Sequence, residues 1–312
     1  MKIFTRPEDF PQGSATVLTI GKFDGLHIGH RGILRRLLAL AAENSLESTV
    51  VTFDRHPLEL INPLASPTPL TTLEQKLELI SETGIDNAVV LAFDQERQAQ
   101  TAADFVRMLA EDLGAKIILA GRDFHFGDQG LGNLQTLTEL AEQYGYTLEL
   151  IEDELEGSNG EARRVSSTWI RELLLQGRVE EANRLLDRVH SVSGEVVHGL
   201  KRGRELGFPT ANLEAHPQGF VPADGIYAGY LRLGDRRYPA AISIGTNPTF
   251  DDVPIRQVEA YLPGVELDLY GKQVTIEFVS WIRGMVAFTG IDALIERMHQ
   301  DVDEILKRLA QE

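Results

Sequence analysis

The sequence predicts two domains of different fold class. An α/β domain with a parallel, Rossmann-like sheet is expected over residues 1–186, and a small β-barrel with a terminal helix over residues 187–312. Apolar runs alternate with helical patterns through the first part, which is typical of parallel strands joined by crossover helices. Near residue 187 the pattern changes to short β-like runs separated by turn residues, which indicates a barrel or sandwich.

In the first domain, apolar runs of strand type are followed by amphipathic patterns of helix type. Thr71 and Glu74 have the spacing of a capping box, which predicts a helix that continues to about Glu82. Ligands of such sheets bind beyond the carboxyl ends of the strands, where the strand order reverses. Strands are expected at 16–20, 48–53, 88–93, 116–120 and 147–151, and further helices at 30–43, 102–112, 134–144, 167–176 and 179–186.

The second domain is expected to consist mainly of β-strands. Its β-like runs are separated by turn residues at short, irregular spacing. An amphipathic pattern over 291–309 then predicts one terminal helix. The expected strands are 191–197, 225–233, 236–244, 256–262 and 273–279.

The composition limits the function classes. A net charge of −17 argues against broad nucleic-acid binding, which needs a basic face. The sequence has no cysteine, so disulfides and thiolate metal sites are excluded. We expect a cytoplasmic protein without membrane association, because no stretch approaches the roughly 18 apolar residues of a membrane span and the first residues lack an apolar signal. The basic loop His198–Arg204 is an exception in this acidic chain and predicts a small anionic ligand.

The segment Thr19–His30 (TIGKFDGLHIGH) predicts a phosphate site between a strand and a helix. Its glycines allow the backbone to approach a ligand closely, and a helix N-terminus offers N–H groups to anions. His27 and His30 lie one turn apart, and we expect them to donate to phosphate oxygens during in-line transfer. The alternative interpretation is a glycine-rich turn with two incidental histidines. Zinc would need a third ligand at suitable spacing, and none is evident.

This segment resembles the G-x-F-D-G-x-H-x-G-H motif of the bacterial bifunctional riboflavin kinase/FAD synthetases, whose first domain is an FMN adenylyltransferase with a nucleotidyltransferase fold. Gly121–Gly127 is similar to the family block G-x-D-F-x-F-G, and Val165–Arg171 to V-S-S-T-x-I-R. The hydroxyl residues of the second block can cap a helix and donate to phosphate, and Arg171 can bind the β- and γ-phosphates. The resemblance implies that ATP is bound by Gly21, Phe23, Asp24, Gly25, His27, His30, Ser166, Ser167, Thr168 and Arg171.

The resemblance also implies a flavin site in this domain. Its residues would be Phe53, Asp54, Asp123, Phe124 and Phe126. The block Thr52–Pro57 departs from the family pattern T-F-x-P-H-P, because Arg55 replaces the first proline. Phe124 and Phe126 offer aromatic faces to a ring system, and core packing is expected for at least one of them.

The segment Gly194–Asn212 resembles the riboflavin kinase block G-x-V-x-H-G-x-x-x-G-R-x-L-G-F-P-T-A-N-L. Thr210 and Asn212 lie two residues apart on an extended segment, so they face the same side, and their oxygens suit the Mg²⁺ of Mg²⁺-ATP. Glu259, in a run similar to R-x-V-E, is implied as the catalytic residue that acts on the acceptor hydroxyl, whereas a lone strand glutamate is usually a solvated edge residue. For ATP the resemblance implies Gly194, His198, Gly199, Arg204, Gly207, Pro209, Thr210 and Asn212.

The flavin end of the kinase domain departs from the family pattern. Arg283 is implied in flavin binding, but in R-x-E-x-x-F-x-S the glutamate is Met285 and the serine is Gly290. The implied function is ATP-dependent phosphorylation of riboflavin to FMN, followed by transfer of AMP from ATP to FMN, which gives FAD and pyrophosphate. Two alternatives stay open: a nucleotidyltransferase with another acceptor, and a flavin- or nucleotide-binding protein that has lost one activity. The expected partners are ATP, riboflavin and FMN, and self-association is compatible with the sequence.

Overall fold

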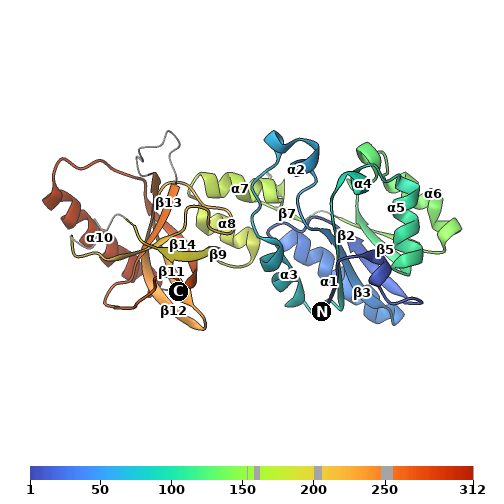
Figure 1. The fold of residues 1–312 in the computed structure, drawn as a ribbon, viewed down its shortest axis with the longest axis horizontal. Helices are drawn as coiled ribbons and strands as arrows, with labels where there is room; N and C mark the ends of the chain where they lie inside the picture. Colours follow the sequence, from blue (N-terminus) through green and yellow to red (C-terminus); the bar gives the residue numbers. More distant parts are fainter. Residues whose placement is uncertain (153, 158–161, 200–205, 247–255, 312) are drawn as a thin grey trace. The chain divides into compact units, whose positions relative to one another are not determined.

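The computed structural model describes residues 1–152, 154–157, 162–199, 206–246 and 256–311 (Figure 1). The chain forms two compact units, Met1–Ser166 and Ser167–Glu312. The helices over 167–186 are therefore grouped with the second unit, and the domain boundary expected after residue 186 stays a prediction. Both expected fold classes are confirmed: the first unit contains a parallel sheet and the second a closed barrel with a terminal helix.

The first unit is built on a six-stranded sheet in which every neighbouring pair is parallel. The order of its strands is β1-β4-β3-β2-β5-β6. Five of them match the predicted runs within two residues at either end, and β1, at the edge, was not predicted. The strands are β1 (Lys2–Phe4), β2 (Thr16–Ile20), β3 (Glu47–Phe53), β4 (Asn87–Leu91), β5 (Ala115–Gly121) and β6 (Thr147–Ile151).

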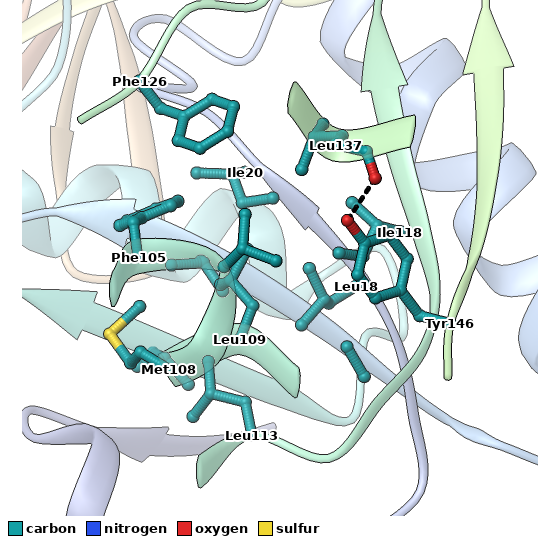
Figure 2. Packing of buried hydrophobic residues seen from close by; sticks show 14 of the residues in the cluster. Leu18, Ile20, Phe105, Met108, Leu109, Leu113, Ile118, Phe126, Leu137 and Tyr146 are labelled. Carbon is teal, nitrogen blue, oxygen red and sulfur yellow. Dashed lines mark hydrogen bonds between the residues drawn. The ribbon is translucent and has the colours of Figure 1, made fainter. Parts of the chain in front are cut away.

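Helices cover both faces of this sheet because its central strands are apolar on both sides. α1 (Ile28–Asn44) and α3 (Leu73–Ser81) pack on one face. α5 (Ala102–Arg107), its π-helical continuation η3 (Met108–Asp112) and α6 (Leu134–Tyr144) pack on the other. Figure 2 shows the second of these cores, where the Tyr146 hydroxyl donates to the Leu137 carbonyl. Short elements complete the unit: η1 (Pro7–Asp9), α2 (Leu58–Ile61), η2 (Pro63–Ala65), α4 (Gln95–Gln98), η4 (Asp128–Gly130), β7 (Leu155–Glu156) and β8 (Arg163–Arg164).

The capping box of α3 differs by one residue from the predicted one. Thr72, not Thr71, is the N-cap, and its hydroxyl accepts from the Gln75 N–H while the Gln75 side chain accepts from the Thr72 N–H. The Thr71 hydroxyl is used elsewhere, because it accepts a hydrogen bond from the Gly25 N–H at 3.3 Å. A tertiary contact thus decides between two sequence-equivalent caps.

The strand order reverses between β2 and β5. From β2 the chain moves through β3 to β4 on one side, whereas β5 and β6 extend the sheet on the other side. Loops that leave the carboxyl ends of two such strands diverge and open a crevice, where ligands of α/β sheets bind. The segments after β2, β3 and β5 carry three of the motif blocks of the first domain, and the block Val165–Arg171 follows β8.

The second unit begins with α7 (Ser167–Leu175) and α8 (Val179–Leu186), followed by an antiparallel barrel of order β10-β13-β12-β11-β14-β9. α10 (Ile291–Leu309) packs on the barrel through Ile305 and Leu309. The Asn183 side chain of α8 donates to the Phe278 carbonyl and accepts from the His190 N–H, which ties α8 to two strands. The strands are β9 (His190–Val197), β10 (Thr210–Leu213), β11 (Gly225–Leu233), β12 (Arg236–Thr246), β13 (Arg256–Tyr261) and β14 (Gln273–Arg283).

Among the described residues, no helix combines the length and the apolar character that are needed to cross a membrane.

Candidate active sites

The first candidate site lies in the turn between β2 and α1. His27 is the N-cap of α1, and its Nδ1 accepts a hydrogen bond of 3.4 Å from the His30 N–H. Three residues of this turn have left-handed backbone, namely Phe23 (φ 50°), Gly25 (φ 77°) and Leu26 (φ 38°). Such backbone is costly outside glycine and persists where the surroundings fix it. The turn is therefore a tightly determined loop at the end of a buried strand.

The two histidines form a stacked pair. Their ring centroids are 3.7 Å apart with an interplanar angle of 18°, and the Phe23 ring packs edge-on against His30 at 5.2 Å. Burial lowers the pKa of His30 well below 6.5, and the cations of Lys22 and Arg164 act in the same direction, as His27 does when protonated. Nδ1 of His30 is buried and has no hydrogen-bond partner among the described residues. At neutral pH the His30 ring is therefore uncharged.

Gly21 and Gly29 leave room for the rings of this turn. A Cβ on Gly21 would lie 3.0 Å from the Phe23 ring, and one on Gly29 would lie 3.2 Å from His27 Nδ1. The predicted role of these glycines was close approach of backbone to a ligand. The structure adds a second reason, because a larger residue at position 21 would press on the Phe23 ring and one at position 29 on the His27 ring.

Asp24 holds the loop that precedes α3. Its Oδ1 accepts from the Leu70 and Thr71 N–H groups at 2.9 and 3.3 Å. The predicted ATP contact of Asp24 therefore competes with two backbone donors. This observation supports a role of Asp24 in fixing the turn itself.

A pocket of about 150 Å³ opens beside this turn. Phe53 and Asp54, two of the predicted flavin residues, line it together with Lys22, Asp24 and Lys76. Asp54 Oδ1 accepts from the Phe93 N–H at 2.9 Å, and the Phe53 ring packs edge-on against Phe93. The other lining residues are Arg55, His56, Glu59, Pro67, Pro69, Thr71, Thr72 and Leu73.

The other predicted flavin residues follow β5. Asp123 is paired with Arg164, whose guanidinium nitrogens lie 2.5 and 3.3 Å from its carboxylate, and this contact lowers the pKa of Asp123. Phe126 is 7% exposed and packs on Phe105 in the core, while Phe124 stacks on Phe126 and is half-buried. Core packing of one member of the pair agrees with the expectation, and Phe124 is the one available to a ligand.

The block Ser166–Arg171 spans the boundary between the units. Ser166 ends the first unit, and α7 begins at Ser167 and carries Thr168 and Arg171 one turn apart. The predicted helix start is thus confirmed, and the ATP contacts of these four residues stay a prediction.

The second candidate site lies on β10 and β13. Glu259 is opposite Asn212 in the β10–β13 register, and the Thr210 hydroxyl donates to Glu259 Oε2 at 3.2 Å. The Asn212 amide donates to Thr210 O and Oγ1 at 3.2 and 3.3 Å. Burial raises the pKa of Glu259, and the Thr210 hydrogen bond opposes that shift. The three side chains predicted for metal binding and catalysis thus share one face.

Gly199 leaves space for the side chain of Asn212. A Cβ at this position would lie 2.5 Å from Asn212 Oδ1, so Gly199 borders the amide oxygen. His198 packs against the Tyr270 ring, with centroids 3.9 Å apart and an interplanar angle of 34°.

The remaining residues predicted for kinase ATP are less closely grouped. Gly194 lies three residues before the β9 residue that pairs with Asn212, beside Glu214 and Pro217. Gly207 has left-handed backbone (φ 87°), and Pro209 is exposed. Arg204 lies outside the described residues.

Arg283, the predicted flavin residue of the kinase, is held by the terminal helix. Its guanidinium donates to both oxygens of the buried Asp301 at 2.6 to 3.0 Å, and Arg297 also pairs with Asp301 at 2.9 Å. Met285, which replaces the family glutamate, is 56% exposed. Arg283 is thus committed to an ion-pair network between β14 and α10.

Sequence reasoning missed Lys76 and Arg164. Lys76 is 9% exposed and lies on the apolar stripe of α3, three residues after Leu73 and four before Ile80. A lysine at an apolar position of an amphipathic helix is a usable signal, because a buried ammonium needs acceptors. The sequence around Arg164 gives no comparable indication, since its partner Asp123 lies 41 residues earlier in the chain.

Comparisons with known proteins cover both units. A family model of FAD synthetase matches residues 10–169, and one of riboflavin kinase matches residues 186–309. A bifunctional riboflavin kinase/FMN adenylyltransferase of Listeria monocytogenes is 30% identical over 286 residues, which are 91% of this chain and 90% of the relative. One from Escherichia coli (strain K12) is 35% identical over 287 residues, with the same coverage. A solved structure described as a macrolide-efflux protein from Streptococcus pneumoniae has a TM-score of 0.83 and 28% identity, and covers 96% of this chain and 97% of that chain.

Proposed function

Because the chain belongs to the family of the bifunctional riboflavin kinase/FMN adenylyltransferases, we propose that the residues of its two candidate sites divide the two activities between them. The protein is an enzyme of flavin-cofactor synthesis that converts riboflavin to FMN and FMN to FAD. The turn after β2 would carry adenylyl transfer, and the cluster on β10 and β13 would carry the kinase reaction.

For adenylyl transfer, the stacked histidines at the strand-order reversal carry the proposal. An FMN phosphate oxygen attacks the α-phosphorus of ATP, the bond to the bridging oxygen breaks, and pyrophosphate leaves. His27 and His30 stabilise the charge that develops on the phosphate oxygens, as prepositioned donors do in phosphoryl-type transfers. An uncharged His30 acts here as a hydrogen-bond donor and not as a fixed cation. The sequence block Ser166–Arg171 is proposed to bind the phosphates of the same ATP.

For the kinase reaction, the contact between Thr210 and Glu259 carries the proposal. Glu259 accepts the proton of the riboflavin 5′-hydroxyl as its oxygen bonds to the γ-phosphorus, and ADP leaves. Burial makes this carboxylate a stronger base than an exposed one, which suits the role.

Besides riboflavin, the kinase site is proposed to bind ATP together with Mg²⁺. The hydroxyl of Thr210 and the amide oxygen of Asn212 are hard oxygen donors, and the lack of a side chain at Gly199 makes room for the Asn212 amide. When bound, the metal ion would neutralise charge on the ATP phosphates. The net charge of −17 supports small-molecule substrates over nucleic acid, and the absence of cysteine is consistent with the cytoplasm as the proposed location.

A crossed pair of variants tests this division. His30→Ala should lower FAD formation from supplied FMN by about 10²–10³ and leave FMN formation unchanged. Glu259→Gln should lower FMN formation by about 10²–10⁴ and leave FAD formation unchanged. The measurement is the rate of each half-reaction, with flavins resolved by chromatography.

His216→Ala and Glu266→Gln are matched controls, because both residues are exposed. Both controls should retain both activities. Equal loss of both activities in either test variant would contradict the division.

A further inference from the structure

We infer that Lys76 is a positioning residue for adenylyl transfer, whose ammonium group fixes the turn after β2 against the end of β3 and so holds the ring of His30 in place. The inference rests on the proposed role of His30. Lys76 lies on α3, 46 residues after His30 in the sequence, and is 9% exposed. It acts through the backbone of the turn and not on substrate.

The ammonium of Lys76 has three donors, and the structure gives it three acceptors. Nζ lies 2.9 Å from the Phe53 carbonyl, 3.1 Å from the Thr52 hydroxyl and 3.3 Å from the Lys22 carbonyl. Thr52 and Phe53 end β3, and Lys22 belongs to the turn after β2. Because three N–H groups meet three oxygens, the ammonium links two neighbouring strand ends with every donor used.

The link from Lys22 to His30 is short. The carbonyl that Lys76 holds belongs to the residue before Phe23, whose backbone is left-handed (φ 50°). The Phe23 ring is 1% exposed and packs edge-on against His30 at 5.2 Å. A shift of the Lys22 carbonyl would therefore move Phe23, and the His30 ring would lose one of its two aromatic neighbours.

Charged groups around Lys76 fall into two classes. Asp24 and Asp54 favour the ammonium, while burial disfavours it more strongly, so the pKa of Lys76 falls from 10.5 to about 8. Lys22, Arg55, His56 and Glu59 line the same pocket. His30 lies in the field of Lys76, and its pKa is lowered well below 6.5, so it stays neutral at alkaline pH.

The lowered pKa of Lys76 shows whether its ammonium group stabilises the fold or only positions the turn. Between about pH 8 and 10.5 the unfolded chain binds more protons at Lys76 than the folded chain does, so the free energy of unfolding rises with pH in that window. Below pH 8 the buried charge therefore costs stability. An ammonium that weakens the fold at neutral pH, yet joins two strand ends at a candidate site, fits positioning better than structural support.

The test compares the full-length protein with Lys76→Met, which keeps the length of the side chain, and with Lys76→Arg, which keeps the charge. At pH 7, Lys76→Met should lower kcat for FAD formation by about 10- to 100-fold, with a smaller change in the KM for ATP. FMN formation, which is proposed for the second unit, should stay within about twofold of the wild type and controls for enzyme concentration. Circular dichroism and thermal unfolding of the same samples control for folding of the first unit. Lys116→Met, a change at an exposed lysine on β5, should leave both reactions unaltered.

The pH profile gives the second readout. In the wild type, kcat for FAD formation should fall above a midpoint near pH 8, because the neutral amine has only two N–H groups for three acceptors. Lys76→Met should lack this alkaline decline, and in Lys76→Arg it should move upward by more than one pH unit, since arginine stays charged.

Unaltered FAD kinetics in Lys76→Met would overturn the inference, as would an alkaline decline that is the same in wild type and Lys76→Arg. If Lys76→Met does not fold, the pH profile of FAD formation in Lys76→Arg is the test of the inference. A wild-type protein that makes no FAD at all, or a His30→Ala variant with the wild-type rate, would instead contradict the proposed function.

Discussion

At the scale of single residues, burial sets the protonation of one key group in each site. It lowers the pKa of His30 and raises that of Glu259, so both shifts favour the uncharged form. The consequences differ because the roles differ. An uncharged imidazole keeps one N–H as a donor, whereas a carboxylate whose pKa is raised becomes a stronger base once it is ionised.

FMN formation should therefore have an acid limb whose midpoint lies above 4.5, the ordinary value for glutamate. The Thr210 hydroxyl stabilises the ionised Glu259, so Thr210→Val should raise its pKa further and move the limb to higher pH. Thr210→Ser should restore the wild-type limb. The measurement is kcat for FMN formation against pH at saturating ATP and Mg²⁺, with FAD formation as the control. A limb that stays in place, or moves to lower pH, in Thr210→Val would contradict this assignment.

At the scale of elements, helix ends place several of the functional groups. His27 caps α1 with its own ring, and Thr72 caps α3, which carries Lys76. α10 begins at Ile291, and the preceding Gly290 is the N-cap, with extended backbone and no side chain to cap the helix. Gly290 is the position where the family motif has serine, so this departure first affects the start of the terminal helix.

Serine at position 290 should stabilise the second unit. The space around a Cβ there is open, and a serine hydroxyl can accept from the first free N–H groups of α10. Gly290→Ser should raise the free energy of unfolding by a few tenths of a kcal/mol, and Gly290→Ala should lower it, because alanine is a poor N-cap. Thermal unfolding by circular dichroism checks the order serine, glycine, alanine. Equal melting temperatures would show that the cap does not limit stability.

The local sequence pattern predicts the bounds of most helices and strands. It fails where a contact with a residue far along the chain determines the start of an element. The bounds of β2, β6, β11, α6, α8 and α10 agree with the predicted ranges. The helices α8 and α10 are amphipathic, and β2 is a short apolar run that is buried throughout. β1 was missed because three residues are too short to show a period. The α3 cap was misplaced because Thr71 and Thr72 have equivalent spacing, and only the Gly25 contact distinguishes them.

The same limit applies to the sites. Motifs placed His27 and His30 at the start of a helix and Thr210, Asn212 and Glu259 on extended segments, and the structure brings each group together. Lys76 and the pairing of Arg283 with Asp301 depend on contacts across α3 and α10, and no motif encodes them.

At the scale of the whole molecule, the two units should be separable. α8 belongs with the barrel, since Asn183 bonds to β9 and β14 and Glu180 accepts from the Trp281 N–H. A fragment of residues 167–312 should make FMN and no FAD, and should melt at a higher temperature than a fragment of residues 187–312. Chromatography of the flavins and calorimetry of both fragments check this expectation. A folded 167–312 fragment without kinase activity would contradict it.

The contrast between an open sheet and a closed barrel also has a consequence for association between molecules. A closed barrel pairs its strands all the way round, whereas an open sheet presents unpaired backbone groups at its edges. All five residues of β4 are buried, and β1 covers its outer backbone edge in parallel register. β1 thus pairs with the backbone groups at the outer edge of the buried, mainly apolar strand β4. Because β1 and β6 are the two edges of the sheet, removal of Lys2–Phe4 would expose the backbone edge of the fully buried β4 to pairing with another molecule.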